Sequence, residues 1–274
     1  MRVGVVQLSS TLETERNLSV AAGLIENAGR SGARLVVLPE VFNRRGESAR
    51  VREQAEELEG ASLGWAAEQA RAQRLWLVAG SIAEQAGTAC HNTSCLFSPE
   101  GERVAVYRKI HLFDVDIPGA VAKESAHVTA GGELVVSQVE GCPVGLTVCY
   151  DLRFPELYRR LTLLGARMIT VPSAFTERTG RDHWEVLLRA RAIENQVFVL
   201  APNQFGTTAG TPTSYGRSMI IDPWGTVLAQ AGDGESLILA DLDFARQAEV
   251  RSRLPSLQHR RPDLYAWPDP IAEG

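Results

Sequence analysis

The sequence predicts an α/β fold in a single domain. Short apolar segments typical of strands recur along the chain, and amphipathic segments typical of helices separate several of them. At 274 residues and 45% apolar composition, the chain is long enough to bury a full hydrophobic core. Some of the expected strands follow one another across short turns, which argues against a plain alternating βα barrel.

The expected strands are short runs of mainly aliphatic residues that end at polar or turn-forming positions. They cover residues 3–8, 35–38, 76–79, 95–97, 104–107, 144–148, 168–171, 197–201, 218–221 and 237–241. Between two of them, the stretch 114–133 contains glycine, proline and polar residues, so we expect an irregular loop there. Loops of that length often carry function.

The expected helices follow the 3.6-residue apolar period. In one of them, Pro155 suits the first helical position because its missing N–H would be unpaired anyway, Leu157 and Leu161 share a face, and Gly165 marks the end. Another, which contains Trp184, is expected to be structural. The helices cover residues 14–31, 62–74, 155–164, 182–195 and 244–254.

Ser62 has two interpretations. The segment Gly60-Ala61-Ser62-Leu63-Gly64 matches the G-x-S-x-G motif of serine hydrolases, but that motif requires an apolar strand before it. The preceding residues 53–59 are acidic and helix-like instead. We therefore interpret Ser62 as the N-cap of helix 62–74.

Cys149 follows the apolar strand 144–148 and precedes a helix that starts at Pro155. A helix N-terminus favours a thiolate over a thiol, so this is a position in which a cysteine acts as a nucleophile. A lone cysteine in an apolar stretch is also often a buried structural residue. The remaining motifs decide between these two interpretations.

Glu40 and Lys109 stand at or near the ends of two further expected strands. In α/β folds, strand ends usually present the catalytic side chains. Each residue taken alone has a simpler explanation, as a solvated carboxylate or a surface lysine. Together with Cys149, they indicate covalent catalysis by an activated thiol.

These residues lie in an ordered set of motifs: Leu38-Pro39-Glu40, the segment 107–113 with the sequence YRKIHLF, and the segment 149–157 with the sequence CYDLRFPEL. The set resembles the nitrilase superfamily of carbon–nitrogen hydrolases, and the resemblance extends from Val3 to about Tyr265. It implies a four-layer α-β-β-α sandwich, a fold that composition alone does not predict.

The resemblance also implies a mechanism that needs neither a metal nor a cofactor. Cys149 attacks an amide carbonyl, and Glu40 first accepts the thiol proton and then protonates the leaving amine. Lys109 and the backbone N–H of Tyr150 stabilise the negative oxygen, and Lys109 also favours the Cys149 thiolate. Glu124 is expected beside Lys109.

Within the superfamily, the chain is most similar to the Nit branch. The amidases that act on deaminated glutathione and release 2-oxoglutarate and cysteinylglycine are the nearest match, because Pro155 and Ser173 stand where ω-amidases tend to have Ala and Gly. An ω-amidase that releases ammonia from 2-oxoglutaramate or 2-oxosuccinamate is the alternative, and a non-catalytic binding or scaffold protein is a further one. Arg217 departs from the pattern, in which His is expected. The Nit-like blocks are residues 114–119, 172–175, 183–194, 222–225 and 259–265.

Substrate contacts are less specified by the sequence. By resemblance, Phe175 and Thr176 lie near the pocket mouth, and Thr176 is expected to touch a small amide substrate that bears carboxylates. Arg178 and Arg217 are candidates for binding those carboxylates.

Two other patterns have unremarkable explanations. Cys90, His91 and Cys95 form one isolated cluster, which fits strand-edge packing better than the usual zinc spacings. The triplet Asn92-Thr93-Ser94 has the form of a glycosylation acceptor, and we interpret it as loop sequence.

The net charge of -5 and the absence of long basic runs argue against nucleic-acid binding. No apolar run approaches the roughly 20 residues that cross a membrane, and the first residues lack the features of a signal peptide. We therefore expect a cytoplasmic protein with four free cysteines. The whole chain, 1–274, is expected to be one hydrolase domain with residues 255–274 as a tail, in a homodimer or a higher homo-oligomer.

Overall fold

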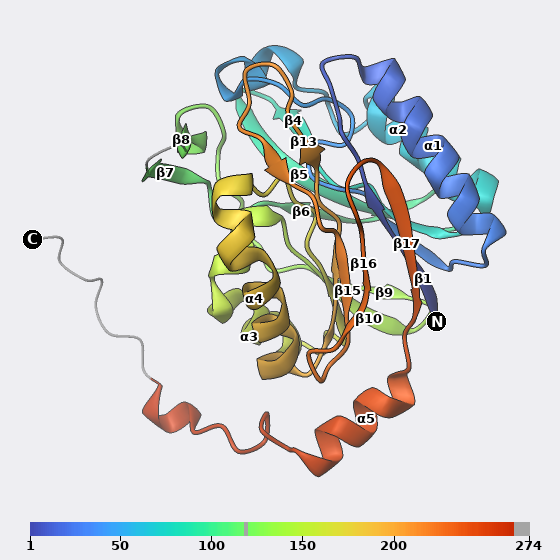
Figure 1. The fold of residues 1–274 in the computed structure, drawn as a ribbon, viewed down its shortest axis with the longest axis vertical. Coiled ribbons are helices and arrows are strands. Elements are labelled where there is room, and N and C mark those ends of the chain that lie inside the picture. Colours follow the sequence, from blue (N-terminus) through green and yellow to red (C-terminus); the bar gives the residue numbers. More distant parts are fainter. Residues whose placement is uncertain (118–119, 266–274) are drawn as a thin grey trace, which may run out of the picture.

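The computed structural model describes residues 1–117 and 120–265, and its strands form two large sheets (Figure 1). The first sheet has the order β17-β1-β2-β3-β5-β4, and β6 pairs with β5. Strands β1, β2 and β3 are parallel, and the others are antiparallel to their neighbours. The bounds are β1 (Arg2–Gln7), β2 (Leu35–Val37), β3 (Trp76–Val78), β4 (Ile82–Ala86), β5 (Ala89–Phe97), β6 (Arg103–Arg108) and β17 (Ser236–Asp241).

The second sheet has the order β16-β15-β12-β11-β10-β9. Its centre is parallel, because β10, β11 and β12 run in one direction, and its outer strands are antiparallel. The bounds are β9 (Val136–Val139), β10 (Cys142–Leu146), β11 (Met168–Thr170), β12 (Phe198–Ala201), β15 (Met219–Ile221) and β16 (Val227–Gln230).

Helices cover the outer face of each sheet, so the layers are α, β, β and α. Figure 1 shows the first two helices on one side of the molecule and the next two on the other, with the strands between them. The period of two along β1 explains this: Val3 and Val5 belong to the core between the sheets, whereas Val6 and Leu8 pack with the helices of the first sheet. The predicted four-layer sandwich is thus confirmed. The helices are α1 (Thr14–Arg30), α2 (Ala61–Gln73), α3 (Pro155–Leu163), α4 (Glu177–Asn195) and α5 (Phe244–Arg253).

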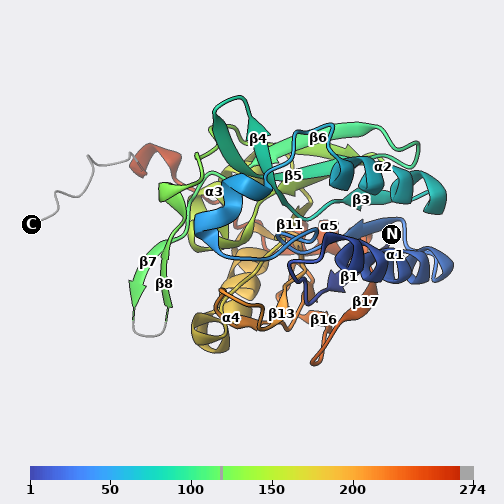
Figure 2. The same ribbon diagram turned by 90° about the horizontal axis from the view of Figure 1, so that it is seen from above.

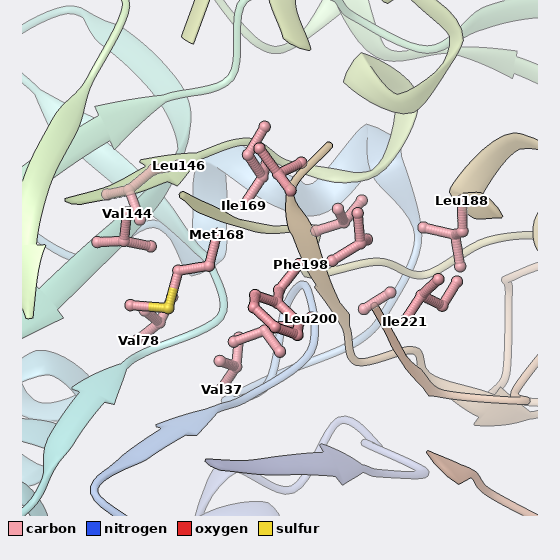
Figure 3. Close-up of a cluster of buried hydrophobic side chains, with 14 of the residues drawn as sticks. Val37, Val78, Val144, Leu146, Met168, Ile169, Leu188, Phe198, Leu200 and Ile221 are labelled. Carbon is pink, nitrogen blue, oxygen red and sulfur yellow. The ribbon is translucent and has the colours of Figure 1, made fainter. Parts of the chain in front are cut away.

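The two sheets meet through a continuous layer of aliphatic and aromatic side chains. Figure 3 shows Val37 and Val78 of the first sheet facing Met168 and Leu200 of the second. All four are fully buried. Because both sheets are fixed against each other by this layer, the loops at their ends hold a defined relative position.

Several short elements differ from the sequence prediction. The stretch 114–133, expected to be irregular, contains the hairpin of β7 (Asp114–Ile117) and β8 (Ala120–Lys123) and a 3-10 turn, η2 (Glu124–Ala126). Figure 2 shows this hairpin projecting from the body. Its strands pair only with each other, and their sequences, DVDI and AVAK, lack the continuous aliphatic run of the predicted strands. Strands β4, β9 and β16, and the short pair β13 (Phe205–Gly206) and β14 (Ser214–Tyr215), were likewise not predicted.

Helix α4 begins five residues before its predicted start at residue 182, because its first turn is polar and lacks the apolar period. The other four helices lie within one residue of their predicted bounds.

The N-terminus of α2 is capped differently from the prediction. Ser62 lies inside the first turn, and its own N–H donates to Glu56 Oε2 at 2.8 Å while its hydroxyl donates to Glu56 Oε1 at 2.5 Å. The Glu56 carboxylate therefore caps the helix, and Ser62 is not the N-cap. The segment 53–59 is also not a regular helix. A 3-10 turn, η1 (Ser48–Gln54), ends within it, and the backbone of Glu56 then forms an isolated β-bridge with that of Glu84.

Strand β5 has β3 and β4 along one side and β6 on the other, because β3 and β6 both pair with Leu96 and Phe97, and β4 and β6 both pair with Thr93. Cys95 therefore lies inside the sheet. Cys90 and His91 pair with β4 alone, at the edge of the sheet, and the Cys90 carbonyl accepts the Thr129 N–H on the other side. Cys90 and Cys95 are free, as are Cys142 and Cys149.

The predicted tail, residues 255–274, is described only as far as Tyr265. It follows α5 at the lower end of the view in Figure 1 and includes a 3-10 turn, η4 (Pro262–Leu264). Leu264 and Tyr265 are exposed. None of the helices in the described ranges is both long and apolar enough to cross a membrane.

Candidate active site

The three predicted reactive side chains meet at the ends of strands from both sheets. Glu40 follows β2 and Lys109 follows β6 of the first sheet, whereas Cys149 follows β10 of the second. All three line one cavity of about 500 Å³. Glu124, Tyr150, Phe175 and Thr176 line the same cavity, so the structure brings together the predicted catalytic residues and two of the four candidate substrate contacts.

Lys109 lies between two carboxylates. Its Nζ donates to Glu124 Oε2 at 2.8 Å and to Glu40 Oε1 at 3.2 Å, and the lysine is only 2% exposed. Burial alone would lower the pKa of Lys109, but Glu124 and Glu40 outweigh burial and raise it well above its ordinary value. Burial likewise acts to raise the pKa of Glu124, and Lys109 outweighs it, so that this pKa is lowered. These carboxylates therefore favour the charged ammonium form of Lys109.

Asn92, a residue that the sequence analysis did not assign to the site, links the two carboxylates. Its Nδ2 donates to Glu40 Oε1 at 2.8 Å and to Glu124 Oε1 at 3.1 Å. Asn92 lies within β5, so the triplet that we interpreted as loop sequence is part of a strand. The sequence signal for Asn92 is a polar residue within an otherwise buried strand. The triplet also has the form of a glycosylation acceptor, which favoured the interpretation as loop.

The position of Glu40 is fixed from several directions. Its Oε2 accepts the Ala174 N–H at 2.8 Å, and its backbone carbonyl accepts Gln204 Nε2 at 2.8 Å. The turn before it packs against Gly80, where a Cβ would lie 1.9 Å from the Pro39 carbonyl oxygen. Only glycine allows the two backbones to approach so closely.

Cys149 is the first residue of a 3-10 turn, η3 (Cys149–Arg153), and has a positive φ of 49°. Non-glycine residues rarely adopt this conformation, and it is concentrated at functional sites. The backbone N–H of Cys149 donates to the Pro172 carbonyl at 2.8 Å. This turn directs the thiol into the cavity, although the residue is only 8% exposed.

Lys109 favours the Cys149 thiolate, as expected, but the combined effect of its surroundings favours the protonated thiol. Burial raises the pKa of the thiol well above its ordinary value, the Glu40 carboxylate raises it further, and Lys109 opposes them without outweighing them. The thiol thus holds its proton until a base removes it. Glu40 is the carboxylate beside it.

A buried carboxylate braces the turn that carries Cys149. Asp151 accepts the Val148 N–H at 2.8 Å and the Tyr107 hydroxyl at 2.6 Å through Oδ2. Its Oδ1 lies 2.8 Å from Nδ1 of His111, whose ring stacks on Phe154. These contacts therefore connect strand β6 and the turn that carries Cys149, next to Lys109.

Tyr150 is the second residue of η3, and the N–H groups of a first turn have no acceptor within their own helix. Its ring packs edge-on against Phe113 and Phe154. The Arg153 guanidinium lies over the Tyr150 ring at 5.8 Å and over Phe175 at 5.2 Å. These aromatic rings and the Arg153 guanidinium thus pack against one another next to Cys149.

Arg178 and Arg217 are not among the described residues that line the cavity. Arg217 pairs with Asp233 at 2.8 Å, and its backbone carbonyl accepts Trp184 Nε1 at 2.7 Å. The structure therefore does not bring either arginine to the site. Arg44 and Arg45 line the cavity instead.

His91 Nδ1 lies 2.8 Å from the Thr129 carbonyl oxygen, so this ring nitrogen has a hydrogen-bond partner within the protein. Across residues 1–117 and 120–265, no three His, Cys, Asp or Glu side chains are grouped so as to hold a metal ion.

A thiol, a carboxylate beside it, and a charged ammonium are the components of acyl transfer through a covalent intermediate. Residues 2–252 match the family model of the carbon–nitrogen hydrolases. Deaminated glutathione amidase of Mus musculus is 43% identical over 271 residues, which cover 96% of this chain and 84% of that protein. Omega-amidase NIT2 of Danio rerio is 38% identical over 266 residues, with 97% and 96% covered.

A crystal structure of Nit3 from Saccharomyces cerevisiae, a member of branch 10 of the nitrilase superfamily, is similar with a TM-score of 0.85 and 32% identity. The match covers 93% of this chain and 94% of that chain. The predicted resemblance to the Nit branch is thereby confirmed. The chain belongs to the carbon–nitrogen hydrolase family, as an amidase of the nitrilase superfamily.

Proposed function

We propose that this amidase hydrolyses the amide bond of deaminated glutathione and releases 2-oxoglutarate and cysteinylglycine. The observation that carries the proposal is the meeting of Cys149, Glu40 and Lys109 in one cavity, in a chain 43% identical to an enzyme named for that reaction. The cavity is within the usual size range of small-molecule sites, about 300–1,000 Å³. Several of its lining residues are cationic, which suits a substrate that bears carboxylates.

In the first half of the reaction, Glu40 accepts the proton of the Cys149 thiol as the sulfur attacks the amide carbonyl. A tetrahedral intermediate forms, and its negative oxygen is stabilised by Lys109 and the backbone N–H of Tyr150. The C–N bond then breaks while Glu40 returns its proton to the leaving amine. Cysteinylglycine departs, and the acyl group remains on Cys149 as a thioester.

In the second half, Glu40 accepts a proton from a water molecule that attacks the thioester carbonyl. The same two donors stabilise the second tetrahedral intermediate. The C–S bond breaks, the sulfur recovers its proton, and 2-oxoglutarate is released. Glu124 and Asn92 act by position: they hold the ammonium and the Glu40 carboxylate in place. Phe175 and Thr176 contact the substrate.

A second candidate function has an observation in its favour. The ω-amidase of Danio rerio matches 97% of this chain, so the release of ammonia from 2-oxoglutaramate is the nearest alternative. Both reactions form the same acyl-enzyme and differ in the amine that leaves. A non-catalytic scaffold role is a weaker candidate, because the three reactive side chains are all present and meet in one cavity.

The deciding experiment measures 2-oxoglutarate release from deaminated glutathione and from 2-oxoglutaramate in parallel, with Cys149→Ala as the control. A Cys149-dependent preference of kcat/KM for deaminated glutathione supports the proposal. A preference for 2-oxoglutaramate reassigns the protein as an ω-amidase. Hydrolysis of neither amide contradicts both assignments.

We further propose that the chain works as one domain, in a homodimer or a higher homo-oligomer, in the cytoplasm. Four free cysteines suit a reducing compartment. Exposed apolar side chains suited to a contact between copies lie on α3, on the residue after it and on α4; they are Leu163, Leu164, Val186 and Ile193. Sedimentation equilibrium tests the assembly, and a purely monomeric protein would contradict it.

A further inference from the structure

The cavity holds more cations than its reactive centre uses. Lys109 already has two carboxylate partners. Arg44 and Arg45, which follow Glu40 closely in sequence, also line the cavity, and no carboxylate of a described residue lies within 4 Å of either guanidinium. Glu47 is the nearest carboxylate in sequence to line the cavity with them.

Arg45 is the more deeply placed of the two and is only 4% exposed. Its Nη1 donates to the Gly206 carbonyl at 3.0 Å and its Nη2 to the Pro212 carbonyl at 2.7 Å. Burial lowers the pKa of Arg45 to about 10, while the Glu40 carboxylate raises it. Arg45 lines the same cavity as Glu40, Lys109 and Cys149, so its guanidinium lies within electrostatic reach of the reacting groups.

A buried cation that is held only by neutral carbonyls is costly, because these carbonyls do not compensate its charge. Arg44 adds a second deficit, since its buried Nε has no acceptor among the described residues. An incoming carboxylate supplies both the charge and the acceptor oxygens that are missing, and a guanidinium binds a carboxylate in two parallel hydrogen bonds.

We propose that Arg44 and Arg45 form the subsite that binds the acyl-side carboxylate of the substrate. The inference rests on the proposed function, since it concerns the 2-oxoglutaryl group that both candidate substrates share. The amine product leaves first and needs an open path, whereas the acyl group stays on Cys149. An enclosed residue such as Arg45 is therefore suited to the acyl side.

The test compares Arg45→Gln with Arg251→Gln as a matched control. Arg251 also donates to two backbone carbonyls, those of Gln196 and Ala166, but it does not line the cavity. Arg45→Gln should lower kcat/KM for deaminated glutathione and for 2-oxoglutaramate by about 100-fold, mainly through KM, on the scale of a lost hydrogen-bonded ion pair. Arg44→Gln should act in the same direction with a smaller effect, and Arg251→Gln should leave KM unchanged.

A second measurement separates recognition from structural support. Alkylation of Cys149 by neutral iodoacetamide, followed by mass spectrometry, needs an intact nucleophile turn but no carboxylate subsite. Its rate should stay within about 2-fold of wild type in Arg45→Gln, because the reagent carries no anion for the arginine to bind. An alkylation rate that falls in parallel with kcat/KM would show that Arg45 only supports the loop 206–214, and would overturn the proposal.

Two further outcomes are informative. A loss confined to deaminated glutathione would assign the arginines to the carboxylate of the leaving dipeptide and overturn the acyl-side assignment. If wild type hydrolyses neither amide, the proposed function fails, and titration of 2-oxoglutarate into Cys149→Ala with and without Arg45→Gln then tests the subsite alone. Equal binding by the two proteins would refute it, and binding weakened about 100-fold would support it.

Discussion

The reacting end of the cavity and its arginine-lined part differ in whether their charged side chains have partners of opposite charge. Around Lys109, every charge has a partner: the ammonium contacts two carboxylates, and Asn92 donates to both of them. Around Arg44 and Arg45, the charges are held without carboxylate partners among the described residues. Under the proposed roles, the first arrangement is complete before substrate arrives, and the second is completed by a substrate carboxylate. Reaction type and substrate choice then reside in different side chains.

The largest effect that this comparison predicts belongs to Cys149→Ala. Loss of the nucleophile should lower kcat by roughly 10⁴- to 10⁶-fold, as the removal of a covalent nucleophile does in other hydrolases. Binding of 2-oxoglutarate, measured by calorimetry, should stay within about 3-fold because the arginines are untouched. A variant that loses turnover and product binding together would break the separation of the two parts.

Glu40→Gln comes next in size, with a loss of about 10²- to 10⁴-fold in kcat for removal of a general base. The same change has a second consequence of defined sign. The Glu40 carboxylate raises the pKa of Cys149, so its neutralisation should move the midpoint of iodoacetamide alkylation to lower pH. A midpoint that moves to higher pH would contradict the electrostatic role assigned to Glu40.

The contrast also explains what the sequence could predict. Glu40, Lys109 and Cys149 each stand at the end of an apolar strand, so a local pattern reveals them. Asn92 does not, because its partners Glu40 and Glu124 lie 52 and 32 residues away in the chain. Arg45 contacts carbonyls 161 and 167 residues away, which no local period encodes.

The fold shows the same division. Strands that are buried on both faces, such as β2 and β11, carry a continuous aliphatic signal and were predicted. The edge strand β16 lacks that signal because its residues are at most half-buried, and the hairpin β7–β8 lacks it because charged residues interrupt its aliphatic ones. The sequence did not predict that Glu56 caps helix α2, because Ser62, in the first turn of that helix, is itself a common capping residue.

Asn92→Ala should have an intermediate effect on the reacting end. Its amide donates to two carboxylates, and hydrogen bonds to charged groups contribute about 1.5–3 kcal/mol, so kcat should fall by roughly 10- to 100-fold. KM for 2-oxoglutaramate should change little. Steady-state kinetics separates the two parameters. Asn195→Ala is the comparison for general loss of packing, because Asn195 is buried, donates to the Arg191 carbonyl and does not line the cavity.

The smallest effect is expected for Ser62→Ala, which lies outside both parts of the cavity. Ser62 donates to Glu56 and accepts from Asn43 Nδ2 at 3.0 Å, so its loss should lower the free energy of unfolding by about 1–2 kcal/mol. The helix cap itself persists, because the Glu56 carboxylate still accepts the backbone N–H at position 62. Urea unfolding measures the stability, and kcat/KM at a temperature well below the transition should remain within about 2-fold of wild type. A serine in a G-x-S-x-G motif that served as the nucleophile would instead show the opposite pattern, with normal stability and no turnover.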